Sequence, residues 1–406
     1  MTQKTELVTP APTKRISILF VGMSGNRGGT ETFIFNMAGF LRKNFEKYFD
    51  VYVLDDTQEG ISVPDNLKKM NVKIMKVFVP LGRINHFKKV KILKEFFHQN
   101  PFDIVHINAN SPSFAVYVSE LKGTNTKIVF HSHNTSLSFE NLTQKILYYG
   151  QIHRFRKVLD HTNLTRVAAS DVAGKWMFHQ QKFTTLPNGV NPSNYVVDQA
   201  KRLSMRESFD IPKNASVFLF VGRLEYQKYP SFGILAFKSL LENHPELLGK
   251  VFLIMVGDGS QSADLQTLSK PYHTYIKFLG LRKDVADLMN MADFLLLPSR
   301  FEAMPFVVLE AQASGLKIIQ SSESENKGGI VTSGHFFPSL QQGPGHWGNV
   351  MNQMIENKVP FAARADDNRI FKGTVFNIDK GFDTFVRKIY LSKERSQYNE
   401  KNGPSN

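Results

Sequence analysis

The sequence predicts an α/β protein made of two successive halves, each with a parallel sheet. Short apolar runs of strand length alternate with helical patterns along the chain, an order typical of parallel sheets covered by helices. The alternation pauses at the turn-rich segment LPNGVNPSNY (186–195) and then restarts. The length of 406 residues also exceeds the roughly 250–300 residues at which a single core stops growing.

The first half opens with a strand–turn–helix unit. RISILFVGM (15–23) has strand length, and the segment that follows its Gly-rich turn carries Phe33, Met37, Phe40 and Leu41 at helical spacing. Further buried strands are predicted at 49–55, 72–77, 102–108, 127–133 and 166–170.

The second half repeats the alternation and then loses it. Periodicity fades from about Gly334, and QQGPGHWGN (341–349) predicts a loop because Gly and Pro interrupt helices. GFDTFVRKIYL (381–391) predicts a last amphipathic helix before a polar tail. Buried strands are predicted at 216–224, 251–259, 276–280, 292–299 and 316–321. Two such halves should face each other across a cleft at the carboxyl ends of the strands, where open sheets bind ligands.

The composition excludes several kinds of protein. Without cysteine, the chain has no disulfides, no Cys-ligated zinc and no thiol nucleophile. Its first apolar run is too short for a signal peptide, and no stretch reaches the roughly 18 apolar residues of a membrane span, so we expect a cytoplasmic protein. The formal net charge of +14 attracts nucleic acid, anionic lipid or phosphorylated substrates. Nucleic acid is disfavoured because no recognisable binding module accompanies the charge.

The segment FEAMPFVVLE (301–310) holds two carboxylates around an apolar run. A helix beginning at Pro305 would place Glu302 in the loop before it and Glu310 in its second turn. The N-terminus of such a helix suits a phosphate. The alternative is that Glu302 only complements the helix dipole and that Glu310 faces solvent.

VGRLEYQK (221–228) places two cations just after the first strand of the second half. Arg223 offers bidentate hydrogen bonds and Lys228 a point charge, a combination suited to a diphosphate. The alternative is that both are solvated surface residues.

The motifs, taken together, resemble a known enzyme family. In order along the chain they are GNRGGTETF, FVGRLEYQK, MVGDGSQSADL, FLGLRKDVADLMNMADFLLLPS and FEAMPFVVLEAQASG. They are similar to the retaining glycosyltransferase family 4, and most to its bacterial capsule and exopolysaccharide members. The match extends, with gaps, from about residue 15 to residue 330. It implies a GT-B fold, in which two Rossmann-like domains face a central cleft. Residues 14–188 would bind the acceptor, residues 189–380 the nucleotide-sugar donor, and residues 381–406 would form a terminal helix and tail.

The resemblance implies roles for individual residues. Glu302 would contact hydroxyls of the donor sugar, and Glu310 those of the ribose. Arg223 and Lys228 would bind the diphosphate and stabilise its charge as it leaves, which agrees with the chemistry of glycosyl transfer. The other donor-binding residues implied are Gly28 and Gly29 over the diphosphate, Leu281 and Arg282 at the base, and Met304, Pro305 and Phe306 between the two glutamates.

His131 and His133 end a predicted strand and lie two positions apart, on one face. Family members carry a histidine at this strand end near the donor sugar, and the resemblance favours His133 over His131 as a catalytic residue. A structural role for both is the alternative. VGDGS (256–260) lacks the third glycine and the acidic residue of a dinucleotide fingerprint, so no nicotinamide cofactor is expected. No D-x-D and no metal-ligand spacing occurs, so we expect transfer without metal or cofactor.

The sequence departs from the family pattern at two positions. Ala303 follows the first glutamate where the family usually has Gly, and its methyl group would crowd the donor sugar or change which sugar fits. Lys317 stands where Pro is usual, a change expected to affect only a turn.

Two segments of the first half are basic and amphipathic, at 82–100 and 151–158. Either they are ordinary helices whose apolar faces join the core, or they sit on anionic lipid. The residues predicted for this acceptor or membrane face are Lys88, Lys89, Lys91, Arg154 and Arg156.

The predicted function is that of a retaining glycosyltransferase. It would move a hexose from a nucleotide diphosphate sugar, UDP-linked by preference, to a lipid-linked saccharide in exopolysaccharide or capsule biosynthesis, at the inner face of the cell membrane. One alternative is a sugar-nucleotide epimerase of the same fold, against which the Glu302 and Glu310 pattern argues. The other is a non-catalytic accessory subunit that binds a nucleotide sugar, which Ala303 and the less regular region after Ile330 leave open.

Overall fold

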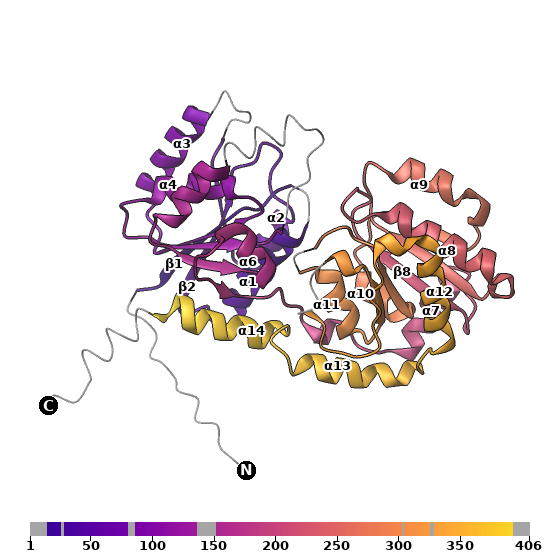
Figure 1. The fold of residues 1–406 in the computed structure, drawn as a ribbon. Coiled ribbons are helices and arrows are strands. Elements are labelled where there is room, and N and C mark those ends of the chain that lie inside the picture. Colours follow the sequence, from indigo (N-terminus) through magenta and orange to yellow (C-terminus); the bar gives the residue numbers. More distant parts are fainter. Residues whose placement is uncertain are drawn as a thin grey trace, which may run out of the picture. The chain divides into compact units, whose positions relative to one another are not determined.

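The computed structural model describes residues 14–25, 28–79, 86–135, 152–302, 304–324 and 329–392. The chain divides into two compact units, each built around its own sheet (Figure 1). Of the described residues, the first unit contains 14–134, 152–185 and 385–392, and the second contains Thr135 and 186–384. The first unit therefore holds both the start and the end of the described chain.

The described part of the first unit contains a seven-stranded parallel sheet with the order β3-β2-β1-β4-β5-β6-β7. The strand order reverses between β1 and β4, which is the kind of switch point where open α/β sheets bind ligands. Every strand predicted in this half is confirmed, and only the short β7 was not predicted. The strands are β1 (Ile16–Val21), β2 (Phe49–Asp55), β3 (Lys73–Lys76), β4 (Ile104–Ala109), β5 (Lys127–Ser132), β6 (Thr165–Ala168) and β7 (Thr184–Thr185).

Helices connect these strands. The predicted first helix is confirmed as α1 (Gly29–Asn44), which buries the apolar residues whose spacing predicted it, Phe33, Met37, Phe40 and Leu41. The others are α2 (Pro64–Lys69), α3 (His86–Gln99), α4 (Ala115–Leu121), a helix described over 152–160, and α6 (Asp171–Phe178).

The second unit contains a five-stranded parallel sheet with the order β10-β9-β8-β11-β12. Successive strand residues face opposite sides, so Phe218 and Phe220 of β8 enter one core cluster and Val217 and Leu219 enter another. Both faces are thus buried, which explains why every strand reads as a continuous apolar run. The five predicted strands are confirmed as β8 (Ser216–Val221), β9 (Val251–Val256), β10 (Ile276–Phe278), β11 (Phe294–Leu297) and β12 (Lys317–Gln320).

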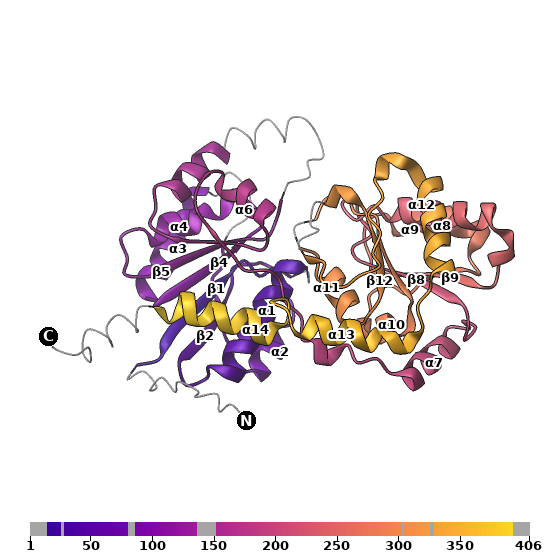
Figure 2. The ribbon, with the colours of Figure 1, turned by 60° about the horizontal axis from the view of Figure 1, so that its bottom comes forward.

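Helices cover both faces of this second sheet (Figure 2). Helices α8, α9 and α12 pack in the cluster that contains Phe218, and α10 and α11 in the one that contains Val217. The bounds are α7 (Gln199–Ser208), α8 (Pro230–Asn243), α9 (Ser262–Ser269), α10 (Val285–Met291), α11 (Phe306–Ala313), α12 (Gly343–Glu356), α13 (Arg364–Lys372) and α14 (Ile378–Phe385). Short 3-10 turns lie at Pro112–Phe114, Pro192–Asn194, Pro245–Leu247, Lys270–Tyr272, Ser322–Ser324, Leu340–Gln342 and Phe361–Ala363.

The loop predicted at QQGPGHWGN is wrong, because most of this segment starts helix α12. Pro344 lies in the first turn, where its missing N–H costs nothing. Trp347 is fully buried and packs edge-on against Phe232, with ring centres 5.3 Å apart. A Cβ at Gly348 would lie 2.9 Å from the backbone nitrogen of Leu240. Gly348 therefore permits close packing of α12 on α8.

Lys317 does more than the sequence predicted. It begins β12, and its Nζ lies 2.8 Å from a carboxylate oxygen of Asp367 and donates to the carbonyl oxygen of Ser333. Both partners in the ion pair are largely buried. The expectation that Lys317 affects only a turn is therefore wrong, since its side chain ties β12 to α13.

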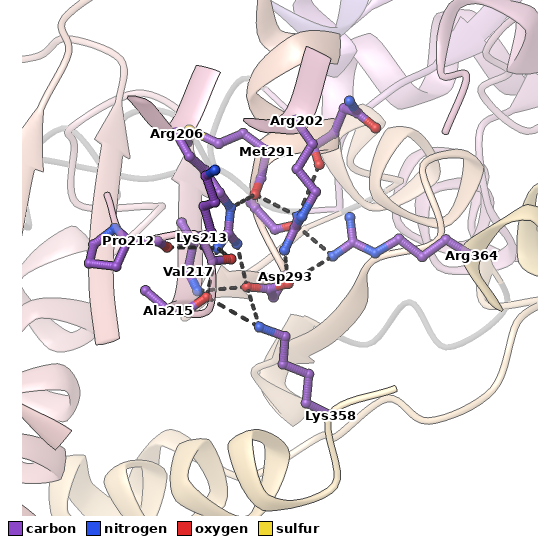
Figure 3. Close-up of polar contacts among 12 residues, drawn as sticks. Arg202, Arg206, Pro212, Lys213, Ala215, Val217, Met291, Asp293, Lys358 and Arg364 are labelled. Atoms are coloured by element: carbon purple, nitrogen blue, oxygen red, sulfur yellow. Dashed lines mark hydrogen bonds and ion pairs between the residues drawn. The ribbon is translucent and has the colours of Figure 1, made fainter. Parts of the chain in front are cut away.

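A buried carboxylate, Asp293, lies just before β11 and gathers four cations (Figure 3). Nitrogens of Arg202, Arg206, Lys358 and Arg364 lie 2.5, 2.8, 3.0 and 3.2 Å from its oxygens. Arg202 and Arg206 also donate to backbone carbonyls at the C-terminal end of α10, where the helix dipole favours positive charge. This cluster joins α7, α10, α13 and β11.

The last described segment returns to the first unit. The predicted terminal helix is confirmed as α14, and it continues as a π-helix over Val386–Tyr390. Within the first unit, the Tyr390 hydroxyl lies 2.5 Å from His106 Nδ1, and Lys127 Nζ donates to the carbonyl oxygen of Ile389. Both Tyr390 and His106 are buried, so this segment completes the packing around β4. The polar tail predicted beyond it lies outside the described residues.

Candidate active site

The predicted donor-site residues of the second unit lie on loops at one edge of its sheet. Strands β8 and β11 are parallel neighbours, so their carboxyl ends meet at the same edge. Arg223 and Lys228 follow β8, and Glu302 follows β11. This is the edge at which open α/β sheets bind ligands.

A short ion pair joins these two loops. Lys228 Nζ lies 2.6 Å from Glu302 Oε1, and Glu302 is only 7% exposed. Glu302 therefore does not merely complement a helix dipole from solvent. A buried carboxylate needs a partner, and here the partner is a cation predicted for the same ligand.

Gln227 makes the second link between the loops, and no sequence motif indicates it. Its Oε1 accepts a hydrogen bond from Arg223 Nη2 at 3.1 Å, and its Nε2 donates to the carbonyl oxygen of Phe301 at 3.0 Å. The backbone N–H of Arg300 donates to the Gln227 carbonyl oxygen at 2.8 Å. Arg223, Lys228 and Glu302 therefore belong to one hydrogen-bonded scaffold.

The segment between the two glutamates is held from inside the unit. Met304 and Pro305 are buried, and the Met304 carbonyl oxygen accepts a hydrogen bond from Asn188 Nδ2 at 2.6 Å. The helix was predicted to begin at Pro305. Instead, Pro305 is the N-cap of α11, and Phe306 is the first helical residue. Glu310 lies in the second turn, as predicted, and is half-buried. Ala303 lies outside the described residues.

The predicted base-binding loop follows β10. Leu281 is 81% exposed, unusually so for a large apolar side chain. Arg282 is ion-paired with Asp284 at 2.6 Å. This loop is fixed to the end of β9, because the Gly257 N–H donates to the Gly280 carbonyl oxygen at 2.9 Å.

Packing explains why the VGDGS motif has a glycine at position 257. Gly257 has a φ of 132°, and a Cβ there would lie 1.9 Å from the carbonyl oxygen of Gly222. Only glycine fits such a close approach of the loops after β8 and β9.

In the first unit, Gly28 is held by a residue that the sequence motifs did not single out. Glu31, buried in the first turn of α1, accepts hydrogen bonds from the Gly28 N–H at 2.9 Å and from the N–H and hydroxyl of Ser24. The amide of Gly28 is thus already bonded to the protein's own carboxylate. Gly29 is the first residue of α1.

The two predicted histidines differ in their surroundings. His131 is fully buried and stacks near His106, with ring centres 5.4 Å apart. His133 follows β5 and is half-buried, with its ring centre 4.0 Å from that of His131 and 4.9 Å from that of Phe33. Burial lowers the pKa of His133 to about 3, so its imidazole is neutral at ordinary pH.

The hydrogen bonds around Asn108 define the tautomer of His133. Asn108 Nδ2 donates to the carbonyl oxygens of Val21 and His106, which leaves its Oδ1 as an acceptor. His133 Nε2 lies 3.0 Å from that oxygen and must therefore carry the proton. Nδ1 of His133 remains as an acceptor, suited to a hydroxyl group and not to a phosphate.

The basic helix α3 has its apolar face in the core. Leu93, Phe96 and Phe97 are buried, whereas Lys88, Lys91 and Lys94 are exposed. The apolar face of α3 therefore joins the core, as in an ordinary helix of the domain, and its outer face is rich in lysine. Lys89 lies over the ring of Tyr117, Arg154 is exposed, and Arg156 donates to the carbonyl oxygen of Trp176.

Two features are absent from the described residues. No cluster of three or more His, Asp or Glu side chains within them could hold a metal ion. No helix in this part of the chain has both the length and the apolar character needed to cross a membrane.

Comparison with known proteins agrees with this architecture. Residues 27–194 match the model of Glycosyltransferase Family 4, and residues 201–343 match that of Glycosyl transferases group 1. Two units with parallel sheets and this pair of matches define a GT-B glycosyltransferase. The chain belongs to family 4 of these enzymes.

Individual relatives cover most of the chain. It is 25% identical over 349 residues to the UDP-Gal:alpha-D-GlcNAc-diphosphoundecaprenol alpha-1,3-galactosyltransferase of Escherichia coli, covering 83% of this chain and 85% of that protein. The O-antigen biosynthesis glycosyltransferase WclY of Escherichia coli is 24% identical over 314 residues, with 76% and 80% covered. The crystal structure of Anabaena HepE in complex with UDP and glucose aligns with a TM-score of 0.72 at 18% identity, over 93% of this chain and 100% of that one. That likeness shows the shared fold.

Proposed function

We propose that this glycosyltransferase moves a hexose from a UDP-linked sugar, with retention of configuration, to a saccharide carried on a lipid diphosphate in exopolysaccharide or capsule synthesis. The observation that carries the proposal is the scaffold that brings Arg223, Lys228 and Glu302 together at the carboxyl edge of the second sheet. The names of the relatives support the donor and acceptor classes, because one uses UDP-galactose and a diphosphoundecaprenol acceptor and another binds UDP and glucose.

The cations would act on the leaving group. Glycosyl transfer breaks the bond between the anomeric carbon and a diphosphate oxygen, and negative charge grows on that oxygen. Arg223 and Lys228 would stabilise it, since prepositioned charges act where charge develops. Glu302 would hold the sugar hydroxyls and also orient Lys228, to which it is already bonded. Glu310 would bind the ribose.

The proposed transfer is a front-face reaction. The acceptor oxygen bonds to the anomeric carbon on the face from which the diphosphate leaves, and the acceptor proton passes to a phosphate oxygen of that diphosphate. No side chain of the protein then needs to take the proton. His133 would instead accept a hydrogen bond from a donor hydroxyl through its unprotonated Nδ1.

A thermal-shift experiment tests the donor site. Wild type and Glu310→Gln would be melted with UDP, GDP, ADP and their common sugar conjugates, without added metal, since a ligand of the folded state raises apparent stability. We expect selective stabilisation by uridine nucleotides that is reduced in the variant. No stabilisation by any nucleotide would contradict the proposal.

The membrane part of the proposal rests on the outer face of α3. Three exposed lysines there, Lys88, Lys91 and Lys94, would contact anionic lipid, with roughly 1 kcal/mol expected per cation near such a surface. Vesicle flotation at low salt should show binding to anionic but not neutral vesicles. Changing the three lysines to Gln should weaken it, whereas a matched triple change of exposed lysines in the second unit, Lys213, Lys250 and Lys372, should not. Equal binding of both triple variants would contradict this role of α3.

A further inference from the structure

Arg300, two residues before Glu302, is clamped by two tyrosines of the neighbouring loop. Its guanidinium carbon lies 3.5 Å from the ring centre of Tyr229 and 4.3 Å from that of Tyr226. Its backbone is bonded to Gln227, as described above. Tyr226 is 57% exposed, so the clamp reaches the surface at the edge that carries Arg223 and Lys228.

The charge of Arg300 is not neutralised. Within the described residues its guanidinium enters no ion pair, and its Nε is buried without a hydrogen-bond partner. Of the cations on the neighbouring loop, Lys228 is paired with Glu302, and Arg223 donates a hydrogen bond to the side-chain oxygen of Gln227. The carboxylate of Glu225 is held by the N–H and hydroxyl of Ser260. Arg300 is therefore a fixed cation with unused donors.

The clamp also contains backbone strain. Tyr229 has a φ of 50°, in the left-handed region, which is strained for a residue other than glycine. Such strain persists where the surroundings impose it, commonly at ligand sites. Tyr229 lies directly before α8, and its strained backbone conformation accompanies the contact between its ring and Arg300.

We propose that Arg300 is an oxyanion-binding residue of the donor site. An arginine whose face stacks on aromatic rings still presents its edge, and that edge matches a phosphate or carboxylate in bidentate geometry. The oxyanion is either a phosphate of the nucleotide or the carboxylate of an acidic donor sugar. The inference rests on the proposed function, because it places a further contact in the same site.

Calorimetric titration separates the two sources. Wild type, Arg300→Gln and Arg300→Lys would be titrated with UDP, UMP, UDP-glucose and UDP-glucuronate. If Arg300 binds a phosphate, the Kd for UDP should rise about tenfold in Arg300→Gln, with a much smaller change for UMP. If it binds a sugar carboxylate, only the Kd for UDP-glucuronate should rise. In both cases Arg300→Lys, which keeps the charge but not the planar fork, should recover part of the loss.

The matched control is Arg369→Gln, which changes an exposed arginine on α13 and should leave every Kd unchanged. Melting of the free variants checks that the fold is intact. Equal Kd values for wild type and Arg300→Gln with all four ligands would overturn the inference while leaving the donor-site proposal in place. Failure of the wild type to bind any of them would overturn both.

Discussion

Asp293 Oδ2 accepts a hydrogen bond from Arg206 Nη2 at 2.8 Å, and both side chains are buried. Three further cations converge on the same carboxylate. One acidic side chain thus compensates positive charges from α7, α13 and the segment between α12 and α13. Loss of this carboxylate would leave four cations without their shared counter-charge.

Asp293→Asn should destabilise the second unit by about 3–5 kcal/mol, because removal of one partner leaves buried charge uncompensated. Urea unfolding would measure the loss. Asp366→Asn is the matched control, since the Asp366–Arg369 pair is exposed on both sides and should contribute less than about 1 kcal/mol. Similar losses in the two variants would contradict the role given to Asp293.

The same carboxylate should make the protein sensitive to acid. Burial raises the pKa of Asp293, but the charges of Arg202, Lys358, Arg364 and Arg206 outweigh this effect and hold the pKa at about 2, against an ordinary 3.8. The unfolded chain therefore takes up the proton first as pH falls. About 2 kcal/mol of stability, complete above about pH 4, should be lost by about pH 2. The difference between the unfolding free energies of wild type and Asp293→Asn should shrink by about that amount over the interval, and a constant difference would argue against it.

Gly257→Ala should cost about 3 kcal/mol or more, because the new methyl group would meet the Gly222 carbonyl at a strained φ. Gly249→Ala is the control that separates the cost of a positive φ from the cost of steric overlap. Gly249 also has a positive φ, of 73°, but a Cβ there would meet no atom within 4 Å, so about 1 kcal/mol is expected. Denaturant unfolding compares the two, and equal losses would exclude the overlap as the cause.

On the proposed mechanism, Glu302→Gln should lower kcat/KM for sugar transfer by about 100-fold or more, since Lys228 loses its carboxylate and the donor sugar would lose a hydrogen-bond acceptor. Glu225→Gln is the control on the same edge, because that carboxylate is hydrogen-bonded to Ser260 and not to Arg223 or Lys228. It should remain close to wild type in transfer assays. A small effect of Glu302→Gln with an unchanged melting temperature would remove Glu302 from the catalytic set.

His133 should stay neutral from about pH 5 to pH 9 with the proton on Nε2, because burial holds its pKa at about 3. Nitrogen-detected NMR of labelled histidines would show this tautomer directly. Asn108→Asp places a carboxylate beside Nε2 and should raise the pKa of His133 into the measurable range. Asp has the same shape as Asn, so this change alters only the charge beside His133. A His133 that titrates near 6.5 in the wild type would refute the assignment.

The strands were predictable because a parallel sheet buried on both faces leaves continuous apolar runs, and β2 has the predicted bounds. Helix α12 was not, because GPGHWG has the composition of a turn. Gly348 is needed because α12 packs closely on α8. This contact depends on tertiary packing, so the local sequence does not indicate it.

The candidate site likewise contains residues that the sequence indicates and residues that it does not. Arg223, Lys228, Glu302 and Glu310 stand out through their motif spacing, and the structure brings the first three together. Gln227 and Arg300 do not stand out, because their roles depend on a loop after β8 meeting a loop after β11. Such a meeting can be read only from the folded chain.

The return of residues 385–392 to the first unit has a consequence for biosynthesis. As the nascent chain leaves the ribosome, the first sheet must wait for the whole of 186–384 before Tyr390 can reach His106. Until then, the buried faces of β4 and its neighbours lack their last cover. The half of the enzyme that is made first is therefore the last to complete its core.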